Sequence, residues 1–253
     1  GVCTRGTQKG SDMQDLRLPV GLRIPRLVAV GVNAGLALGS LGLWIVAYVQ
    51  QLTWRADFTA FYTGWSLVAN GLGQRLYDYR LQMVTQQQIL GGGYLAGGLL
   101  PFNYPPHVAL LFAPIALLPL DSAYLVWSVL QLSVLTWLCR ALWKHLEAEC
   151  VSVQGRVLGI STTVALPAML AALFLGAFSV FMLLGWLNFA LALRRQDDRR
   201  AGLWVILLTL KPQIAVVPAL VLLAGRRWKA IGVMVGGGLI LVAVTALALG
   251  VGI

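Results

Sequence analysis

Long apolar runs alternate along the chain with short polar segments, most of them basic. No Asp, Glu, Lys, Arg or His occurs in residues 27–52, 157–193 or 230–253. A membrane span needs about 20 apolar residues, and lipid offers no hydrogen-bond partner to the backbone, so each run should be helical. The pattern predicts an all-α, polytopic transmembrane helical bundle. Its second long run holds two short spans, with a natural break at 176–179.

The segment 53–103 has a different character, because tryptophans and tyrosines are spread among polar residues there. Such aromatic side chains are typical of the membrane interface. We expect two short interfacial helices, over 58–70 and 76–90. Residues 1–26 form a polar, basic arm, which the positive-inside rule places in the cytoplasm. One span later, the loop 53–103 is then extracytoplasmic.

The clusters 194–200 and 226–229 are also basic, and the apolar run between them is interrupted at Lys211-Pro212. If both clusters are cytoplasmic, this run must enter and leave the membrane on one side. Two half-length helices broken at Lys211-Pro212 would do this, because broken helices are tolerated where they line a cavity. The alternative is a single span with Lys211 near its centre, at a cost of about 3 kcal/mol. We favour the half-helices, and the number of crossings between 104 and 193 stays open.

The amino-acid composition also indicates a membrane protein, and it favours lipid over nucleic acid as a binding partner. Of the 253 residues, 58% are hydrophobic and 11% charged, whereas a soluble domain carries roughly 25% charged residues. The net charge is +10, and the basic residues that produce it lie beside the apolar runs. This position favours contact with lipid head groups rather than with nucleic acid. The three cysteines lack metal-ligand spacing. We expect no cofactor, and the residues leave open a divalent ion at Asp57.

Three kinds of charged residue could carry chemistry. Asp57, just after the first span, could act as a general base on a hydroxyl group; the alternative is a helix N-cap for the segment that begins at Phe58. Lys211 could neutralise a lipid phosphate in a cavity, or it could snorkel to the interface. Arg75 and Arg80, in the same loop as Asp57, could hold phosphate oxygens.

A spaced set of residues resembles glycosyltransferase family 87, the polyprenyl-phosphate-mannose-dependent α-mannosyltransferases of the GT-C fold class. The set comprises Asp57-Phe58-x-x-Phe61-Tyr62, Gly71, Leu76-Tyr77-Asp78, Phe102-x-Tyr104-Pro105-Pro106, Leu118-Pro119, Trp127, Gly176-x-x-Ser179, Leu210-Lys211-Pro212-Gln213 and Arg226-Arg227-Trp228-Lys229-Ala230. The resemblance runs from about residue 25 to 253 and corresponds to the N-terminal portion of the family. It implies a cell-membrane, multi-pass domain over 27–253 that is C-terminally incomplete.

The resemblance also implies an activity. The enzyme would transfer a mannosyl-type sugar from a polyprenyl-phosphate donor to a glycolipid or glycan hydroxyl, with inversion, on the extracytoplasmic side. The family's catalytic base falls on Asp57, and we assign the donor phosphate to Lys211, Arg75 and Arg80. We expect the substrate cavity to be lined by Tyr62, Tyr104, His107 and Gln213.

Two departures and two rival functions remain. The family commonly shows Gly-Gln where this chain has Gly176-Ala177, and its members continue well beyond 253 residues. Because the chain starts at Gly1 and its last run stops at Ile253, we interpret it as a fragment. The rivals are a transporter or flippase of lipid-linked glycans and a non-catalytic membrane scaffold in which Asp57 only caps a helix.

Overall fold

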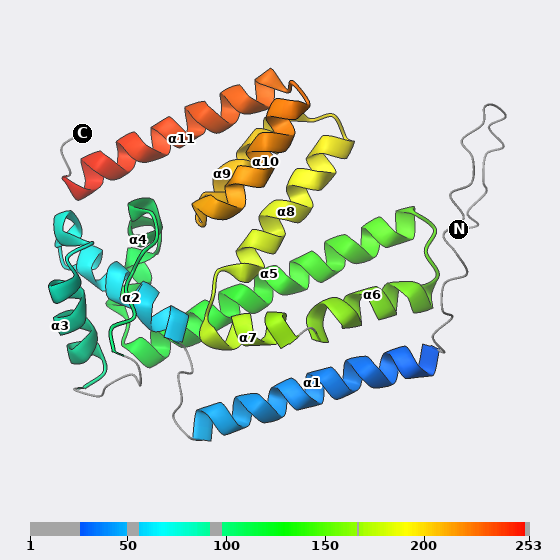
Figure 1. Ribbon diagram of the computed structural model, residues 1–253, viewed down its shortest axis with the longest axis horizontal. Coiled ribbons are helices and arrows are strands. Elements are labelled where there is room, and N and C mark those ends of the chain that lie inside the picture. The colour runs from blue at the N-terminus through cyan, green and yellow to red at the C-terminus, as the bar shows by residue number, and fades with distance from the viewer. Residues whose placement is uncertain (1–25, 50–55, 92–97, 166, 251–253) are drawn as a thin grey trace.

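The computed structural model describes residues 26–49, 56–91, 98–165 and 167–250. These residues form eleven α-helices and two short 3-10 helices, with no strand among them, which confirms the all-α prediction (Figure 1). In chain order the helices are α1 (Arg26–Val49), α2 (Ala56–Ala69), η1 (Gly73–Arg75), α3 (Tyr79–Ile89), α4 (Pro106–Phe112), η2 (Ala113–Leu117), α5 (Leu120–Ala148), α6 (Val153–Ala165), α7 (Pro167–Leu175), α8 (Ser179–Arg194), α9 (Asp198–Leu208), α10 (Pro212–Ala224) and α11 (Trp228–Leu249).

Two of the described helices, α5 and α11, are each long and apolar enough to cross a membrane. Residues Val153–Ala165 and Ala168–Leu175 pass the same test together, although they are bent by 49° at their break. Counted as one span, they raise the number to three. The helix α8 is apolar but shorter, and it starts after the break at 176–178, where the glycine pattern predicted one.

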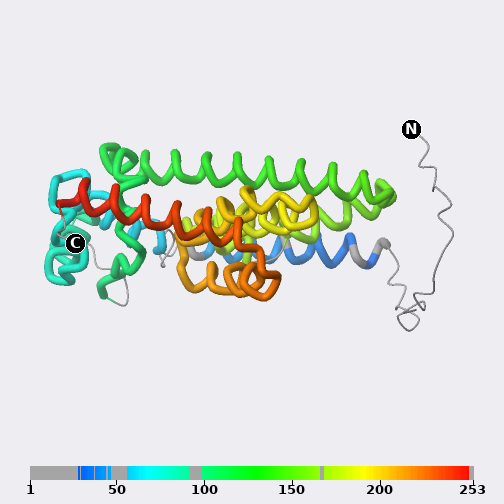
Figure 2. Tube along the Cα trace, turned by 90° about the horizontal axis from the view of Figure 1, so that it is seen from above, coloured from blue at the N-terminus to red at the C-terminus, as the bar shows by residue number. Residues whose placement is uncertain are grey.

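The segment between the two basic clusters folds as a helical hairpin, which confirms the predicted break at Lys211-Pro212, while its path through the membrane stays a prediction. Helix α9 ends at Leu208 and α10 begins at Pro212. Figures 1 and 2 both show the two helices side by side, next to α8 and α11. At 1.5 Å per residue, α9 is about 16 Å long, roughly half the thickness of an apolar bilayer core. If the base of the hairpin lies at the membrane surface, its tip is expected at about mid-depth.

Ion pairs form at the open base of the hairpin and between the ends of α5 and α8. Arg227 donates from Nη1 to Asp198 Oδ1 at 2.8 Å, which joins the two arms of the hairpin. Arg194, at the end of α8, pairs with Glu149 beyond the end of α5, with 3.4 Å between Nη1 and Oε1. Both basic clusters therefore lie at one end, as the sequence predicted.

The loop after α1 contains the expected short helices, with one difference in how they are capped. Helix α3 is capped by Asp78, which accepts hydrogen bonds from the backbone N–H groups of Arg80 and Leu81. Helix α2 begins at Ala56, so Asp57 lies inside its first turn and does not cap a helix that begins at Phe58. That part of the capping alternative is wrong. A carboxylate in the first turn still has a favourable interaction with the helix dipole.

An aromatic core joins α2 to α5, α8 and the segment before α4. Trp65 and Trp127 are fully buried, and their ring centroids are 5.2 Å apart. Phe178 lies 4.5 Å from Phe61 and 5.1 Å from Trp127, measured between centroids. Trp127 also donates its Nε1–H to the Gly176 carbonyl at 2.8 Å. These contacts fix α2 against the turn between α7 and α8.

Gly176 makes that contact possible. Its φ of +76° lies in the left-handed region, and a Cβ added there would lie 2.6 Å from Phe58 Cβ. The chain can therefore turn against α2 only with glycine at this position. The neighbouring Ala177, where the family commonly shows Gln, is buried in the core. No polar side chain extends from that position into the site.

We expect Gly176→Ala to destabilise the protein by about 3 kcal/mol, since backbone strain and overpacking add. Gly91→Ala is the matched control, because Gly91 has a φ of +63° but open space around its added Cβ. The control should lose only the strain contribution, about 1–2 kcal/mol. Melting temperatures measured in detergent should therefore fall further for Gly176→Ala. Equal losses would show that Phe58 moves aside at no cost.

Candidate functional site

Asp57 lies at the N-terminal end of α2, beside the buried ring of Phe58. The carboxylate is half-buried, and among the described residues it forms no hydrogen bond or ion pair. Burial raises the pKa of the Asp57 carboxyl above its usual 3.8, and the nearby ammonium of Lys211 opposes this shift. A partly desolvated carboxylate with a raised pKa and unused acceptor oxygens is suited to accept a proton.

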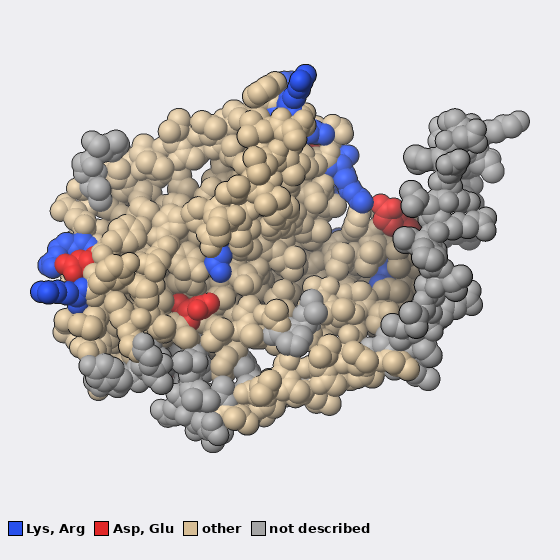
Figure 3. Space-filling view, in the orientation of Figure 1, with Lys and Arg blue, Asp and Glu red and all other residues tan. Residues whose placement is uncertain are grey.

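Lys211 lies at the tip of the hairpin, immediately before α10. Its Nζ is 5.8 Å from the centre of the Tyr104 ring, and it is close enough to Asp57 to lower the pKa of that carboxyl. Figure 3 shows one acidic and one basic patch near the middle of an otherwise uncharged face, with the other charges at the edges. The hairpin therefore brings a cation to the carboxylate across about 150 residues of sequence.

Tyr104 completes this group, and the backbone around it is firmly held. Its carbonyl accepts a hydrogen bond from the Tyr77 hydroxyl at 2.8 Å, and its ring meets Phe61 edge-on with centroids 4.8 Å apart. Burial and the charge of Asp57 raise the pKa of the Tyr104 phenol to about 12. Tyr104 is therefore neutral in the physiological range and can offer a ring face and a hydroxyl donor.

Two buried glutamines, not identified as candidates from the sequence, hold the segment that leads to Tyr104. Gln82 accepts from the Phe102 N–H at 2.8 Å and donates to the Leu76 carbonyl at 2.7 Å. One turn later, Gln86 exchanges two hydrogen bonds with the backbone of Leu100, at 3.0 and 3.1 Å. Their spacing of four residues places both amides on one face of α3. That spacing was the available signal, although neither glutamine stands out from its polar neighbours.

The structure does not bring the two loop arginines to Asp57. Helix α2, about 20 Å long at 1.5 Å per residue, separates Asp57 at its start from η1 and α3 beyond its end. Arg75 donates to Asp78 Oδ2 at 2.7 Å, and Arg80 is exposed in the first turn of α3. The site that we derive from the geometry therefore does not include either arginine.

The other predicted lining residues have different positions. Tyr62 is buried, and its hydroxyl donates to the Leu118 carbonyl at 2.6 Å, so it holds the end of η2. His107 belongs to α4, and its enclosed Nε2 has no hydrogen-bond partner in the described part of the chain. Gln213 is exposed at the hairpin tip, two residues after Lys211. Of these four residues, Tyr104 is near Lys211 in space and Gln213 follows it in sequence, and a lining role stays a prediction for all four.

The group of Asp57, Tyr104 and Lys211 offers a base, an aromatic surface and a cation within one site. No three His, Cys, Asp or Glu side chains of the described residues gather into a candidate metal site. The arrangement is suited to proton abstraction from a hydroxyl group next to a departing anion.

Comparison with known proteins gives one match. The profile of glycosyltransferase family 87 matches residues 102–252. This range is the C-terminal part of the chain, and it contains Tyr104, His107, Lys211 and Gln213. Asp57 lies in the N-terminal part, outside the matched range. No curated protein and no solved structure gives a significant match. Because the matched range covers more than half of the 253 residues, the chain belongs to glycosyltransferase family 87.

Proposed function

We propose that this membrane glycosyltransferase transfers a mannosyl-type sugar from a polyprenyl-phosphate donor to a hydroxyl of a glycolipid or glycan, on the extracytoplasmic side. The observation that carries the proposal is that the half-buried carboxylate of Asp57 and the ammonium of Lys211, 5.8 Å from the centre of the Tyr104 ring, are close enough for their charges to interact. A lysine at mid-depth costs about 3 kcal/mol unless it is paired or lines a polar cavity. A binding site for an anion attached to lipid accounts for its position.

The distribution of charge supports the proposed sidedness. The ends of α5, α8 and the hairpin base carry the basic clusters, and the pairs Arg194–Glu149 and Arg227–Asp198 join them. By the positive-inside rule this end is cytoplasmic. Asp57 lies one span away from it, at the far end of α1, as Figure 1 shows for the start of α2. A lipid-linked donor therefore suits this face better than a soluble nucleotide sugar.

The proposed reaction is a single displacement. Asp57 takes the proton of the acceptor hydroxyl while that oxygen forms a bond to the anomeric carbon of the donor. The bond between this carbon and the phosphate oxygen breaks, and polyprenyl phosphate leaves with the bonding electrons. Lys211 stabilises the negative charge that develops on the phosphate. Because the nucleophile and the leaving group are on opposite faces of the carbon, the configuration inverts.

A transfer assay tests the proposal directly. Membranes that contain the protein are supplied with labelled polyprenyl-phosphate-mannose and extracted glycolipids, in parallel with labelled GDP-mannose. We expect labelled glycolipid from the lipid-linked donor only, and sealed vesicles of known orientation should show transfer on the extracytoplasmic face. Transfer from GDP-mannose with purified protein would contradict the proposed donor class. Movement of the donor across the vesicle without a new glycosidic bond would indicate a flippase.

The acid limb of the pH profile provides a second test. Asp57 must be ionised to accept a proton, and burial raises its pKa above 3.8. We therefore expect kcat/KM to fall as the pH drops through this raised pKa, in a range where an ordinary aspartate would stay ionised. The measurement is kcat/KM from pH 4 to pH 9 in vesicles. An acid limb at the ordinary pKa of aspartate would argue against Asp57 as the base.

A further inference from the structure

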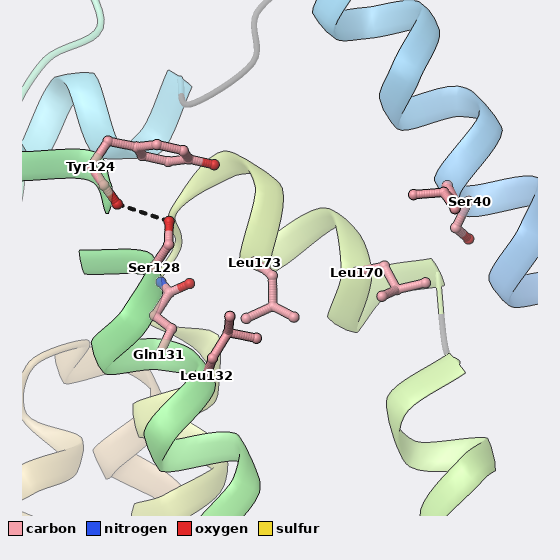
Figure 4. Close-up of a pocket in the computed structure, with 8 residues that line it drawn as sticks. Ser40, Tyr124, Ser128, Gln131, Leu132, Leu170 and Leu173 are labelled. Atoms are coloured by element: carbon pink, nitrogen blue, oxygen red, sulfur yellow. Dashed lines mark hydrogen bonds between the residues drawn. The ribbon is translucent and has the colours of Figure 1, made fainter. Parts of the chain in front are cut away.

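A cavity of about 410 Å³ lies between α1, α5 and α7 (Figure 4). This volume falls in the range of roughly 300–1,000 Å³ that is usual for small-molecule sites. Its walls are mostly apolar, and it lies along helices of the membrane region. Its lining includes Ser40, Tyr124, Ser128, Leu132, Leu170 and Leu173.

One wall of the cavity connects directly to the proposed site. Tyr124 lines the cavity, and its ring meets that of Phe58 edge-on with centroids 5.3 Å apart. Phe58 follows Asp57 in the first turn of α2. The end of the cavity at Tyr124 therefore lies beside the start of α2, and a chain lying in the cavity would place its polar head near Asp57.

This wall is also held rigidly. The Tyr124 hydroxyl donates to the Phe174 carbonyl at 2.8 Å, which ties α5 to α7. Gln131, which is fully buried and lines the cavity about two turns of helix after Tyr124, donates to the Ala177 carbonyl at 2.8 Å. A cavity whose walls are fixed in this way loses little conformational freedom when it is filled.

In Figure 1 the hairpin and the helices α1 and α7 are drawn on opposite sides of α5, whereas in Figure 2 all of them lie on the same side of it. In a single displacement the attacking hydroxyl and the leaving phosphate approach the anomeric carbon from opposite faces. A donor phosphate at Lys211, on the hairpin, leaves the cavity between α1, α5 and α7 for the chain of the acceptor.

We propose that the cavity between α1, α5 and α7 binds the hydrocarbon chain of a lipid-linked acceptor and thereby directs its hydroxyl toward Asp57. This inference rests on the proposed function and specifies the acceptor as an amphiphile with a long chain. Apolar surface, membrane depth and continuity with Phe58 favour a hydrocarbon chain as the occupant. The donor also has such a chain, so the test must separate the two substrates.

Ser128→Phe is the test variant, because the serine lines the cavity and its hydroxyl bonds only to the Tyr124 carbonyl of the same helix. Ser133→Phe is the matched control. Ser133 is exposed on the same helix, outside the cavity lining, and it bonds in the same way to the Val129 carbonyl. Acceptors are methyl, octyl and hexadecyl mannosides, and donors are long- and short-chain polyprenyl-phosphate-mannose.

We expect Ser128→Phe to raise KM for hexadecyl mannoside by about tenfold, the effect of losing roughly two buried methylene groups. KM for methyl mannoside and for both donors should stay unchanged, and Ser133→Phe should match wild type. An increase in KM for the long-chain donor alone would assign the cavity to the donor and overturn the proposal. Equal effects of the two variants would overturn it as well.

Photolabelling makes the test independent of catalysis. A palmitoyl lipid with a diazirine on its chain is incorporated into phosphatidylglycerol vesicles, and labelled peptides are identified by mass spectrometry. We expect label on α5 and α7 in wild type and in Ser133→Phe, but not in Ser128→Phe. If the transfer assay fails while this labelling pattern appears, the proposed function is wrong and the chain-binding cavity stands. Label spread evenly over the apolar helices would refute the cavity as a site.

Discussion

Replacing Asp57 by Asn should lower the transfer rate by about a thousandfold while the protein keeps its fold. The expected loss lies within the factor of about 10²–10⁴ that a positioned general base contributes. Asn has nearly the same shape and cannot accept the hydroxyl proton. The substitution removes a partly desolvated charge but leaves the Lys211 ammonium without its carboxylate, so the melting temperature should fall modestly. The measurement is the initial rate of transfer at equal protein amounts, together with the melting temperature.

Asp78→Asn is the control for this prediction. Asp78 comes from the same loop, caps α3 and pairs with Arg75 at 2.7 Å. Asn caps a helix about as well as Asp, and the exposed ion pair adds little to stability. The control should therefore transfer sugar at a rate close to that of wild type. If Asp57→Asn is equally active, Asp57 has only a structural role, as the scaffold interpretation requires.

Replacing Lys211 by Met should lower kcat by about a hundredfold. Removing one preorganised stabilising group from a transition state costs about 10²–10³ in kcat. Met has a similar length and suits an apolar surrounding, so the hairpin should still form. Because the Lys211 ammonium lowers the pKa of Asp57, its loss should also move the acid limb of the pH profile to higher pH.

This shift separates an electrostatic role from a structural one. A variant with a merely displaced hairpin would lose activity without a directed change in the acid limb. Lys229→Met is the control, since Lys229 is exposed near the hairpin base, at the other end of the bundle. Lys211→Arg should recover part of the rate. A pH profile of Lys211→Met that overlays that of wild type would contradict the proposed pairing of Lys211 with Asp57.

The helices and the hairpin could be predicted from the sequence because their signals are local. The Lys211-Pro212 break lies between two basic clusters, and only a return to the same side reconciles all three features. The break at 176–179 is similarly visible in a short stretch. These features depend on backbone conformation and on the cost of charge in lipid, which the sequence determines directly.

The composition of the site was less predictable because it depends on which ends of helices meet. Arg75 and Arg80 share a loop with Asp57, yet α2 carries them about 20 Å away. The hydroxyl of Tyr62 donates a hydrogen bond to the Leu118 carbonyl, which comes within reach only when η2 is folded. The cavity beside Tyr124 arises from three helices that are distant in sequence. No short pattern encodes such contacts.

The hairpin also has a consequence for how the protein is made. Neither α9 nor α10 is long enough to cross a bilayer alone, so the insertion machinery cannot insert either helix as an independent transmembrane span. Their slot is formed by α8 and α11: Gly185 leaves room for Leu208 on one side, and Gly202 leaves room for the backbone of Ala230 on the other. Since α11 follows the hairpin in synthesis, the hairpin can settle in this position only after α11 has entered the membrane. Lys211 therefore takes its position after α11 is inserted, when the carboxylate that offsets its charge has long been synthesised.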